Sequence, residues 1–134
     1  MELQIKTNCA TGSSSKDKLL FTFCQKQGIK DACCETGEIP AQNYKCYHNK
    51  YKGIELSQCQ NFKFDYNIPL RGNVTYSDIS AKDNWTPESV KLLFDDDKTF
   101  DCSCNGELSE NVKSLNFNCT IKRKFTYLGP LHVL

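Results

Sequence analysis

The strand pattern of this chain is clearest between Cys59 and Phe94, where the sequence reads CQNFKFDYNIPLRGNVTYSDISAKDNWTPESVKLLF. In the first part of this stretch, Phe62, Phe64 and Tyr66 alternate with polar residues. Successive side chains of a β-strand point to opposite faces of a sheet, so this alternation indicates a strand with one buried face and one wet face. The stretch therefore predicts antiparallel β-structure.

Two predicted turns divide the same stretch into three arms. Pro69 and the pair Arg71–Gly72 indicate the first turn, and Asp83–Asn84 indicates the second. Trp85, the only tryptophan, comes just before the third arm, Ser89–Phe94. A side chain of this size buries a large apolar area, so we expect Trp85 to plug the edge of a small core rather than to stack on a ligand.

Short alternating segments continue on both sides of this stretch, and no window shows a sustained helical period. Residues 25–42 are polar and contain Gly28, Gly37 and Pro40, which predicts a loop. Many short strands separated by turns are typical of two packed antiparallel sheets, so we expect one all-β domain over residues 1–134, a two-sheet antiparallel β-sandwich of about eight strands. The predicted strands outside 59–94 are Leu3–Lys6, Leu19–Cys24, Tyr44–His48, Phe100–Cys104 and Leu115–Ile121.

Cysteine is the most unusual feature of the composition, with nine in 134 residues. In so short a chain this predicts a disulfide framework that supplements a small core and forms in an oxidising compartment. The expected β-sandwich is therefore disulfide-stapled. The candidates for bridges are Cys9, Cys24, Cys33, Cys34, Cys46, Cys59, Cys102, Cys104 and Cys119.

Two features of the cysteines allow narrower predictions, although the connectivity as a whole stays open. A bridge between the neighbours Cys33 and Cys34 would strain the peptide, so we expect each to join a different partner. Cys119 is favoured for a buried partner because its strand is the last to close the sheet. The odd cysteine remains free, joins a cysteine outside this chain, or links two copies into a homodimer.

Glycosylation sequons point to the same compartment as the cysteines. They begin at Asn73, Asn84 and Asn118, and together with the cysteines they predict a secreted, extracellular glycoprotein. No apolar run reaches the length of a membrane-spanning helix, so we expect no transmembrane segment. The charge is nearly balanced, with 17 Lys and Arg against 16 Asp and Glu, which disfavours nucleic acid as a partner.

A series of short pieces follows a recognisable order along the chain. The pieces are Leu3–Thr7, Thr11–Gly12, Lys16–Cys24, Cys33–Thr36, Lys52–Leu56, Asp83–Trp85 and Val90–Leu92. Their order resembles that of the PLAT domain, also called the lipoxygenase-homology domain, in a cysteine-rich secreted form. The resemblance covers most of residues 2–104. It implies a β-sandwich of about eight strands that binds lipid surfaces or partner proteins without catalysis, and some members of this family bind calcium in loops.

Residues that carry common active-site chemistry are sparse. His48 and His132 are the only histidines, and no nucleophile elbow, phosphate loop or His-Glu-x-x-His pattern occurs, so we expect no enzyme activity. Neither Cys33–Cys34 nor Cys102–Cys104 has the two-residue gap of a zinc site. Asp95–Asp97 offers oxygen ligands for calcium but lacks the spacing of a calcium loop, and it fits a solvated turn better. We therefore expect no cofactor and no metal site, and calcium is the one metal that stays open.

Two basic clusters are the best candidates for a binding site. Cations pair with anionic headgroups or sulfates, and aromatic rings lie against apolar or sugar faces. The alternative is that the tyrosines belong to the core and the lysines to the wet face of the same strands. The candidate residues are Tyr44, Lys45, Tyr47, His48, Lys50, Tyr51 and Lys52 in the first cluster, and Lys122, Arg123 and Lys124 in the second.

These patterns together predict a secreted, non-catalytic binding module for a membrane lipid, a glycan or a protein receptor. The alternative is a secreted toxin or effector whose disulfide-stapled scaffold acts on a host protein. Binding that weakens with salt favours the first function through the basic clusters, whereas tight, salt-insensitive binding to one protein favours the second.

Overall fold

The computed structural model describes residues 2–9, 17–40, 48–52, 65, 67–78, 80–93 and 98–123. Within these ranges the backbone alone is described at Pro40, His48, Asn49, Tyr51, Lys52, Cys104 and Arg123. The strands are β1 (Glu2–Thr7), β2 (Lys18–Gln27), β3 (Lys30–Pro40), β4 (His48–Lys52), β5 (Leu70–Tyr76), β6 (Pro87–Leu93), β7 (Lys98–Cys104) and β8 (Ser114–Arg123).

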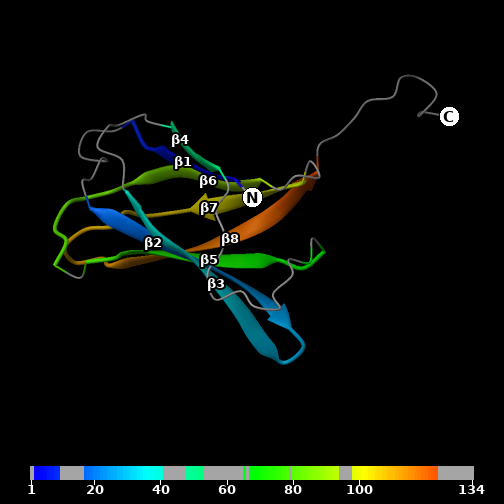
Figure 1. The fold of residues 1–134 in the computed structure, drawn as a ribbon. Coiled ribbons are helices and arrows are strands. Elements are labelled where there is room, and N and C mark those ends of the chain that lie inside the picture. The colour runs from blue at the N-terminus through cyan, green and yellow to red at the C-terminus, as the bar shows by residue number, and fades with distance from the viewer. Residues whose placement is uncertain are drawn as a thin grey trace, which may run out of the picture.

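All of these strands belong to one antiparallel sheet, in the order β3-β2-β5-β8-β7-β6-β1-β4. Figure 1 shows the sheet curling, with β3 and β4 at its two edges. The predicted all-β antiparallel class is confirmed. The described strands form one continuous sheet, because β7 and β8 pair from Lys98 opposite Arg123 to Cys104 opposite Phe117. The expected division into two packed sheets therefore stays a prediction.

In β1, β2, β5, β6, β7 and β8, alternate residues point toward one buried face, as the sequence pattern predicts. In β2, Leu19, Phe21 and Phe23 are fully buried, and the Phe23 ring meets the ring of Phe117 edge-on with centroids 5.9 Å apart. These residues belong to one hydrophobic cluster that draws on both halves of the curled sheet. Other members of the cluster are Leu3, Ile5, Leu70, Val74, Val90, Leu92, Phe100, Leu108 and Leu115.

Trp85 fills the core, which confirms the prediction made from its size. Its side chain is fully buried, and the indole Nε1–H donates a hydrogen bond to the Thr7 hydroxyl at 3.1 Å. Trp85 and Leu108 also exchange two backbone hydrogen bonds of 2.9 Å. These bonds attach the loop after β5 to β1 and to the segment between β7 and β8.

The turn predicted at Arg71–Gly72 is wrong, because both residues lie inside β5. Gly72 is on the buried face between Phe23 on β2 and Phe117 on β8, its partners in the ladder. A Cβ atom at Gly72 would lie 1.9 Å from the Phe117 ring. Glycine here allows an aromatic ring to lie against the backbone, a role that looks like a turn signal when only the sequence is read.

The loop predicted over residues 25–42 is also wrong in its main part. β2 runs on to Gln27 and β3 begins at Lys30, so the polar stretch forms a long hairpin. The turn consists of Gly28 and Ile29, and Gly28 has a φ of 70°, a left-handed conformation that glycine adopts without strain. The two glycines and the charged residues hid a strand that has mostly polar side chains.

Some predicted segments lie outside the described residues, and their outcome stays open. These are the first arm around Phe62 and Phe64, the aspartate turn Asp95–Asp97, and the part of the predicted strand Tyr44–His48 that precedes His48.

Candidate functional site

The described residues of the first basic cluster lie on β4, at one edge of the sheet. Lys50 is exposed and pairs in register with Gln4 of β1. His48 and Lys52 pair with Lys6 and Glu2, and Tyr51 pairs with Leu3. Tyr44, Lys45 and Tyr47 lie outside the described residues.

The second basic cluster lies near the end of β8. Lys122 is exposed and forms an ion pair of 2.7 Å with Asp101 of β7. Arg123 is described by its backbone alone, and Lys124 lies outside the described residues. In the sheet β7, β6 and β1 separate β8 from β4, a path of about 19 Å at the usual strand spacing. The sheet therefore does not place the two clusters on neighbouring strands.

The tip of the β2–β3 hairpin is a candidate site that the sequence analysis missed. Ile29 is 99% exposed, and Lys26 and Lys30 beside it are exposed as well. Register pairing of β2 with its neighbour β5 ends at Cys24 opposite Arg71, so the following residues form a two-stranded projection. The sequence does contain a signal for this site: Ile29, a β-branched apolar residue, follows Gly28 between two lysines.

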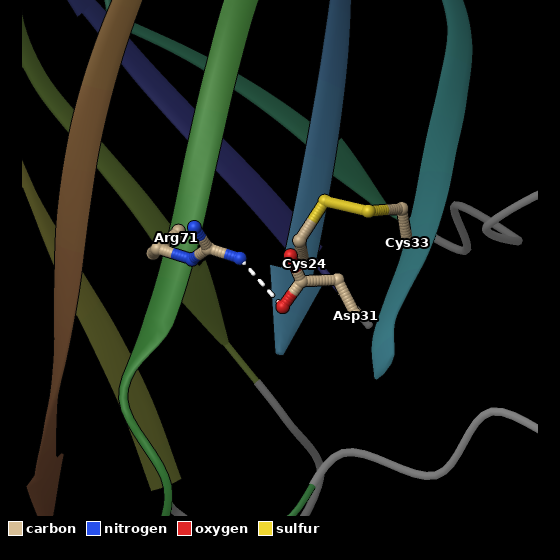
Figure 2. Close-up of a disulfide and its surroundings, with 4 residues drawn as sticks. All are labelled: Cys24, Asp31, Cys33 and Arg71. Carbon is tan, nitrogen blue, oxygen red and sulfur yellow. Dashed lines mark ion pairs between the residues drawn. A yellow bond between two sulfur atoms is a disulfide. The ribbon is translucent and has the colours of Figure 1, made fainter. Parts of the chain in front are cut away.

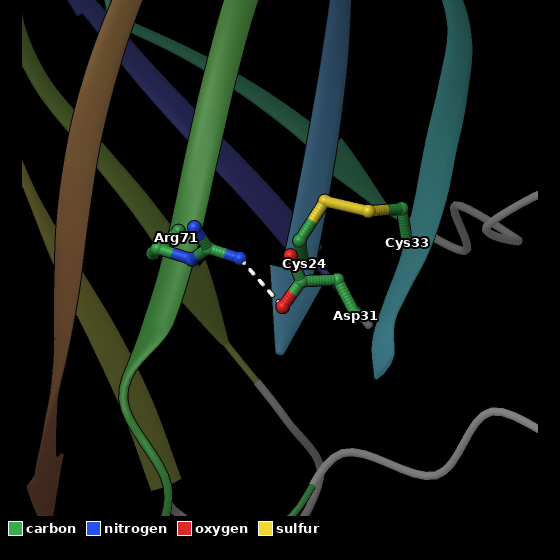
Figure 3. Close-up of polar contacts among 4 residues, drawn as sticks. All are labelled: Cys24, Asp31, Cys33 and Arg71. Atoms are coloured by element: carbon green, nitrogen blue, oxygen red, sulfur yellow. Dashed lines mark ion pairs between the residues drawn. A yellow bond between two sulfur atoms is a disulfide. The ribbon is translucent and has the colours of Figure 1, made fainter. Parts of the chain in front are cut away.

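Two interactions brace the base of this projection (Figure 2). Cys24 and Cys33 are register partners on β2 and β3 and form a disulfide, with their Cα atoms 4.1 Å apart. Arg71 of β5 reaches the Asp31 carboxylate of β3 at 2.7 Å, and Figure 3 shows this ion pair crossing over β2 beside the disulfide. The base of the hairpin is thus linked both to itself and to the next strand.

A buried glutamine, Gln25, anchors the base of the β2–β3 hairpin on the buried face of the sheet. Gln25 is almost fully buried, and its Nε2 donates to the carbonyl oxygens of Asp65 and Ile68 at 2.9 and 3.0 Å. Its Oε1 accepts a hydrogen bond from the Asp65 N–H at 3.0 Å. The side chain therefore has both polar ends satisfied, as a buried amide requires.

The charge at the hairpin tip is positive. Asp31 is the acidic residue nearest the turn in sequence, and its carboxylate is paired with Arg71. Among the described residues, Lys26 and Lys30 form no ion pair. The tip thus presents one apolar side chain between two ammonium groups, an arrangement that suits an anionic surface with an apolar interior.

The asparagines of the three sequons differ in how far their side chains are exposed to solvent. Asn84, in the loop before Trp85, and Asn118, on the outer face of β8, are both exposed. Asn73 is only half exposed within β5, and its Nδ2 donates to Asn116 Oδ1 at 2.8 Å and to Ser114 Oγ at 2.5 Å. Because a glycan is attached to Nδ2, the environment of Asn73 is the least suited to carry one.

The disulfides confirm both narrower predictions about the cysteines. Cys33 is bonded to Cys24, and Cys34 is disulfide-bonded as well, so the neighbours have different partners. Cys119 is bonded to Cys102, and both are buried. Cys9 also takes part in a disulfide. Cys46 and Cys59 lie outside the described residues, so the fate of the odd cysteine stays a prediction.

Asp78, in the loop after β5, has a carboxyl group with a shifted pKa. The backbone N–H and the hydroxyl of Ser80 both donate to Asp78 Oδ1, at 2.9 and 2.7 Å, and these bonds lower the pKa of Asp78. This pattern caps a turn and needs no ligand. Within the part of the chain that is described, no three His, Cys, Asp or Glu side chains gather in a metal-binding group.

Comparison with known proteins gives no match to any family model and none to a curated protein. The described residues contain no helix with the length and apolarity needed to cross a bilayer.

Proposed function

We propose that this chain is a secreted, non-catalytic binding module whose β2–β3 hairpin tip contacts an anionic membrane surface. The observation that carries the proposal is the fully exposed Ile29 between Lys26 and Lys30 on a braced projection. The disulfides and the exposed sequons at Asn84 and Asn118 support an extracellular site of action.

The fold proposed with this function is a PLAT-like β-sandwich. The single hydrophobic cluster supports it, because its members come from both four-strand halves of the sheet order, β3-β2-β5-β8 and β7-β6-β1-β4. Two layers of equal size with one shared core are what a sandwich of this kind requires. The resemblance seen in the sequence implies the same arrangement.

The expected strength of the membrane contact follows from the three side chains at the tip. Transferring Ile29 out of water contributes about 1.5 to 3 kcal/mol. Lys26 and Lys30 each contribute about 1 kcal/mol near an anionic leaflet. The sum of about 3.5 to 5 kcal/mol corresponds to a dissociation constant of about 0.2 to 3 mM, so the contact by itself is weak and reversible.

The test is co-sedimentation with vesicles of phosphatidylcholine and phosphatidylserine, compared with vesicles of phosphatidylcholine alone. We expect binding to the anionic vesicles that weakens as salt rises. Ile29→Asn should lower the partition coefficient at least about tenfold, because it removes the apolar transfer term. Val112→Gln is the control, since Val112 is the other large apolar side chain found exposed among the described residues, at 43%, and glutamine creates no glycosylation sequon there.

Two outcomes would contradict this function. Equal binding of wild type and Ile29→Asn to anionic vesicles would remove the tip from the contact. Absence of binding to either vesicle at millimolar accessible lipid would remove the membrane as the ligand.

A protein receptor is the second candidate, and one observation favours it. The tip is narrow and braced, and a rigid element that presents one apolar anchor loses little entropy when it enters a socket in a partner. This is also the contact expected of a secreted effector that acts on a host protein. With this function the protein would bind no vesicles, and its affinity for the receptor would depend on Ile29 more than on the salt concentration.

A further inference from the structure

The outer face of β1 and β6 contains a pocket that lies apart from the hairpin tip. It is about 420 Å³ in volume. Its lining residues are Gln4, Lys6, Glu88, Ser89 and Lys91. Neither the predicted basic clusters nor the proposed membrane contact includes any of them.

A β-bulge shapes this pocket. Lys6 pairs with Ser89, but the next residue, Thr7, pairs with Pro87, so Glu88 is the extra residue in β6. Pro87 and Val90 are buried, whereas Glu88 and Ser89 between them are not. The bulge thus turns two successive side chains to the outer face, and such bulges commonly re-aim side chains at binding sites.

Lysines flank the lining residue Gln4 on both neighbouring strands, Lys91 within the pocket lining and Lys50 beside it. In the sheet register Gln4 lies between Lys50 of β4 and Lys91 of β6, about 10 Å apart across two strand spacings. Neither lysine forms an ion pair with another described residue. Lys6, one step along β1, is already paired with Glu88 at 2.9 Å. Among the described residues, the row therefore has two ammonium groups without an ion-pair partner, one on each side of a neutral amide.

The polar groups between these lysines include hydrogen-bond acceptors. The Gln4 Nε2 donates to a Glu2 carboxylate oxygen at 2.7 Å, which leaves Oε1 as the end of the amide that accepts. The Ser89 hydroxyl donates and accepts, and the Glu88 carboxylate accepts. Inorganic sulfate or phosphate at neutral pH has few or no hydrogen atoms to donate to such acceptors. A sugar that bears sulfate groups supplies both the anions and the hydroxyl donors.

We propose that this bulge pocket binds a sulfated saccharide, with Lys50 and Lys91 pairing with its sulfates and Gln4 and Ser89 with its hydroxyl groups. The site is independent of the proposed membrane contact, because it uses β1, β4 and β6 rather than the β2–β3 tip. A protein with both sites attaches to sulfated glycans at one surface and to a lipid headgroup layer at another.

The test is titration calorimetry of the whole protein with a heparin-derived tetrasaccharide at 0.15 M salt. The comparison ligands are the desulfated tetrasaccharide and sodium sulfate. We expect the sulfated form to bind at least about tenfold more tightly than the desulfated form, because each charged hydrogen bond is stronger than a neutral one. Lys91→Gln should weaken binding about tenfold, and Gln4→Leu should weaken it without changing the salt dependence.

Lys82→Gln is the matched control, since Lys82 is an exposed lysine in the loop before Trp85, outside the pocket. An equal loss of affinity in Lys82→Gln and Lys91→Gln would mean diffuse charge attraction and would overturn the site. If sodium sulfate bound the protein as tightly as the tetrasaccharide at an equal concentration of sulfate groups, the saccharide would be ruled out as the ligand class. Ile29→Asn should leave this titration unchanged, so failure here is separable from failure of the membrane contact.

Discussion

Gly72 determines how closely β5 and β8 can pack on the buried face. The Phe117 ring lies against its backbone, and a Cβ atom would come within 1.9 Å of that ring. We therefore expect Gly72→Ala to destabilise the protein by about 1 to 3 kcal/mol through overpacking, measured by denaturant unfolding. Phe117→Leu in the same protein should recover part of the loss, because it removes ring atoms that clash. Additive losses in the double variant would contradict this account of Gly72.

Trp85 combines a large buried area with one specific hydrogen bond. Trp85→Ala should lower the free energy of unfolding by about 3 to 5 kcal/mol, as large aromatic truncations in cores do. Thr7→Val should cost about 1 to 3 kcal/mol, because it leaves the indole N–H buried without an acceptor. Denaturant midpoints measure both changes. A midpoint equal to that of the wild type in Trp85→Ala would place this side chain outside the stabilising core.

At the scale of the element, the β2–β3 hairpin depends on the Cys24–Cys33 bridge. The bridge closes a loop with a sequence separation of 9, which corresponds to about 2 to 3 kcal/mol of chain entropy. Replacing both cysteines with serine should speed hydrogen exchange at Lys26–Lys30 while leaving β8 protected, since β8 has its own bridge at Cys119. Uniformly faster exchange across the sheet would mean that the bridge supports the whole fold and not the hairpin.

The sequence predicts strands well where one face is apolar and poorly where the reason for a residue lies on another strand. Alternation places Leu19, Phe21 and Phe23 correctly because burial alone determines their pattern. Gly72 is misread because its partner Phe117 is distant in sequence. The hairpin tip was missed because its strand ends are polar, so only the isolated Ile29 marks it.

At the scale of the whole molecule, sequence patterns give the class but not the closure of the sheet. Whether eight strands form two sheets or one depends on the β7–β8 ladder, which joins segments on either side of a loop. The bulge pocket was equally beyond prediction, since Gln4 and Lys91 meet only through the β1–β6 register. Local composition did identify Lys50, the third member of that row, as a binding candidate.

If the proposed function holds, the hairpin tip enters the headgroup layer of an anionic membrane. The direct measurement is paramagnetic broadening of backbone amide signals by spin-labelled lipid in phosphatidylserine-containing nanodiscs. We expect broadening centred on Gly28, Ile29 and Lys30, and its loss in Ile29→Asn. Broadening that is absent from these residues, or that is centred on another surface of the sheet, would contradict it.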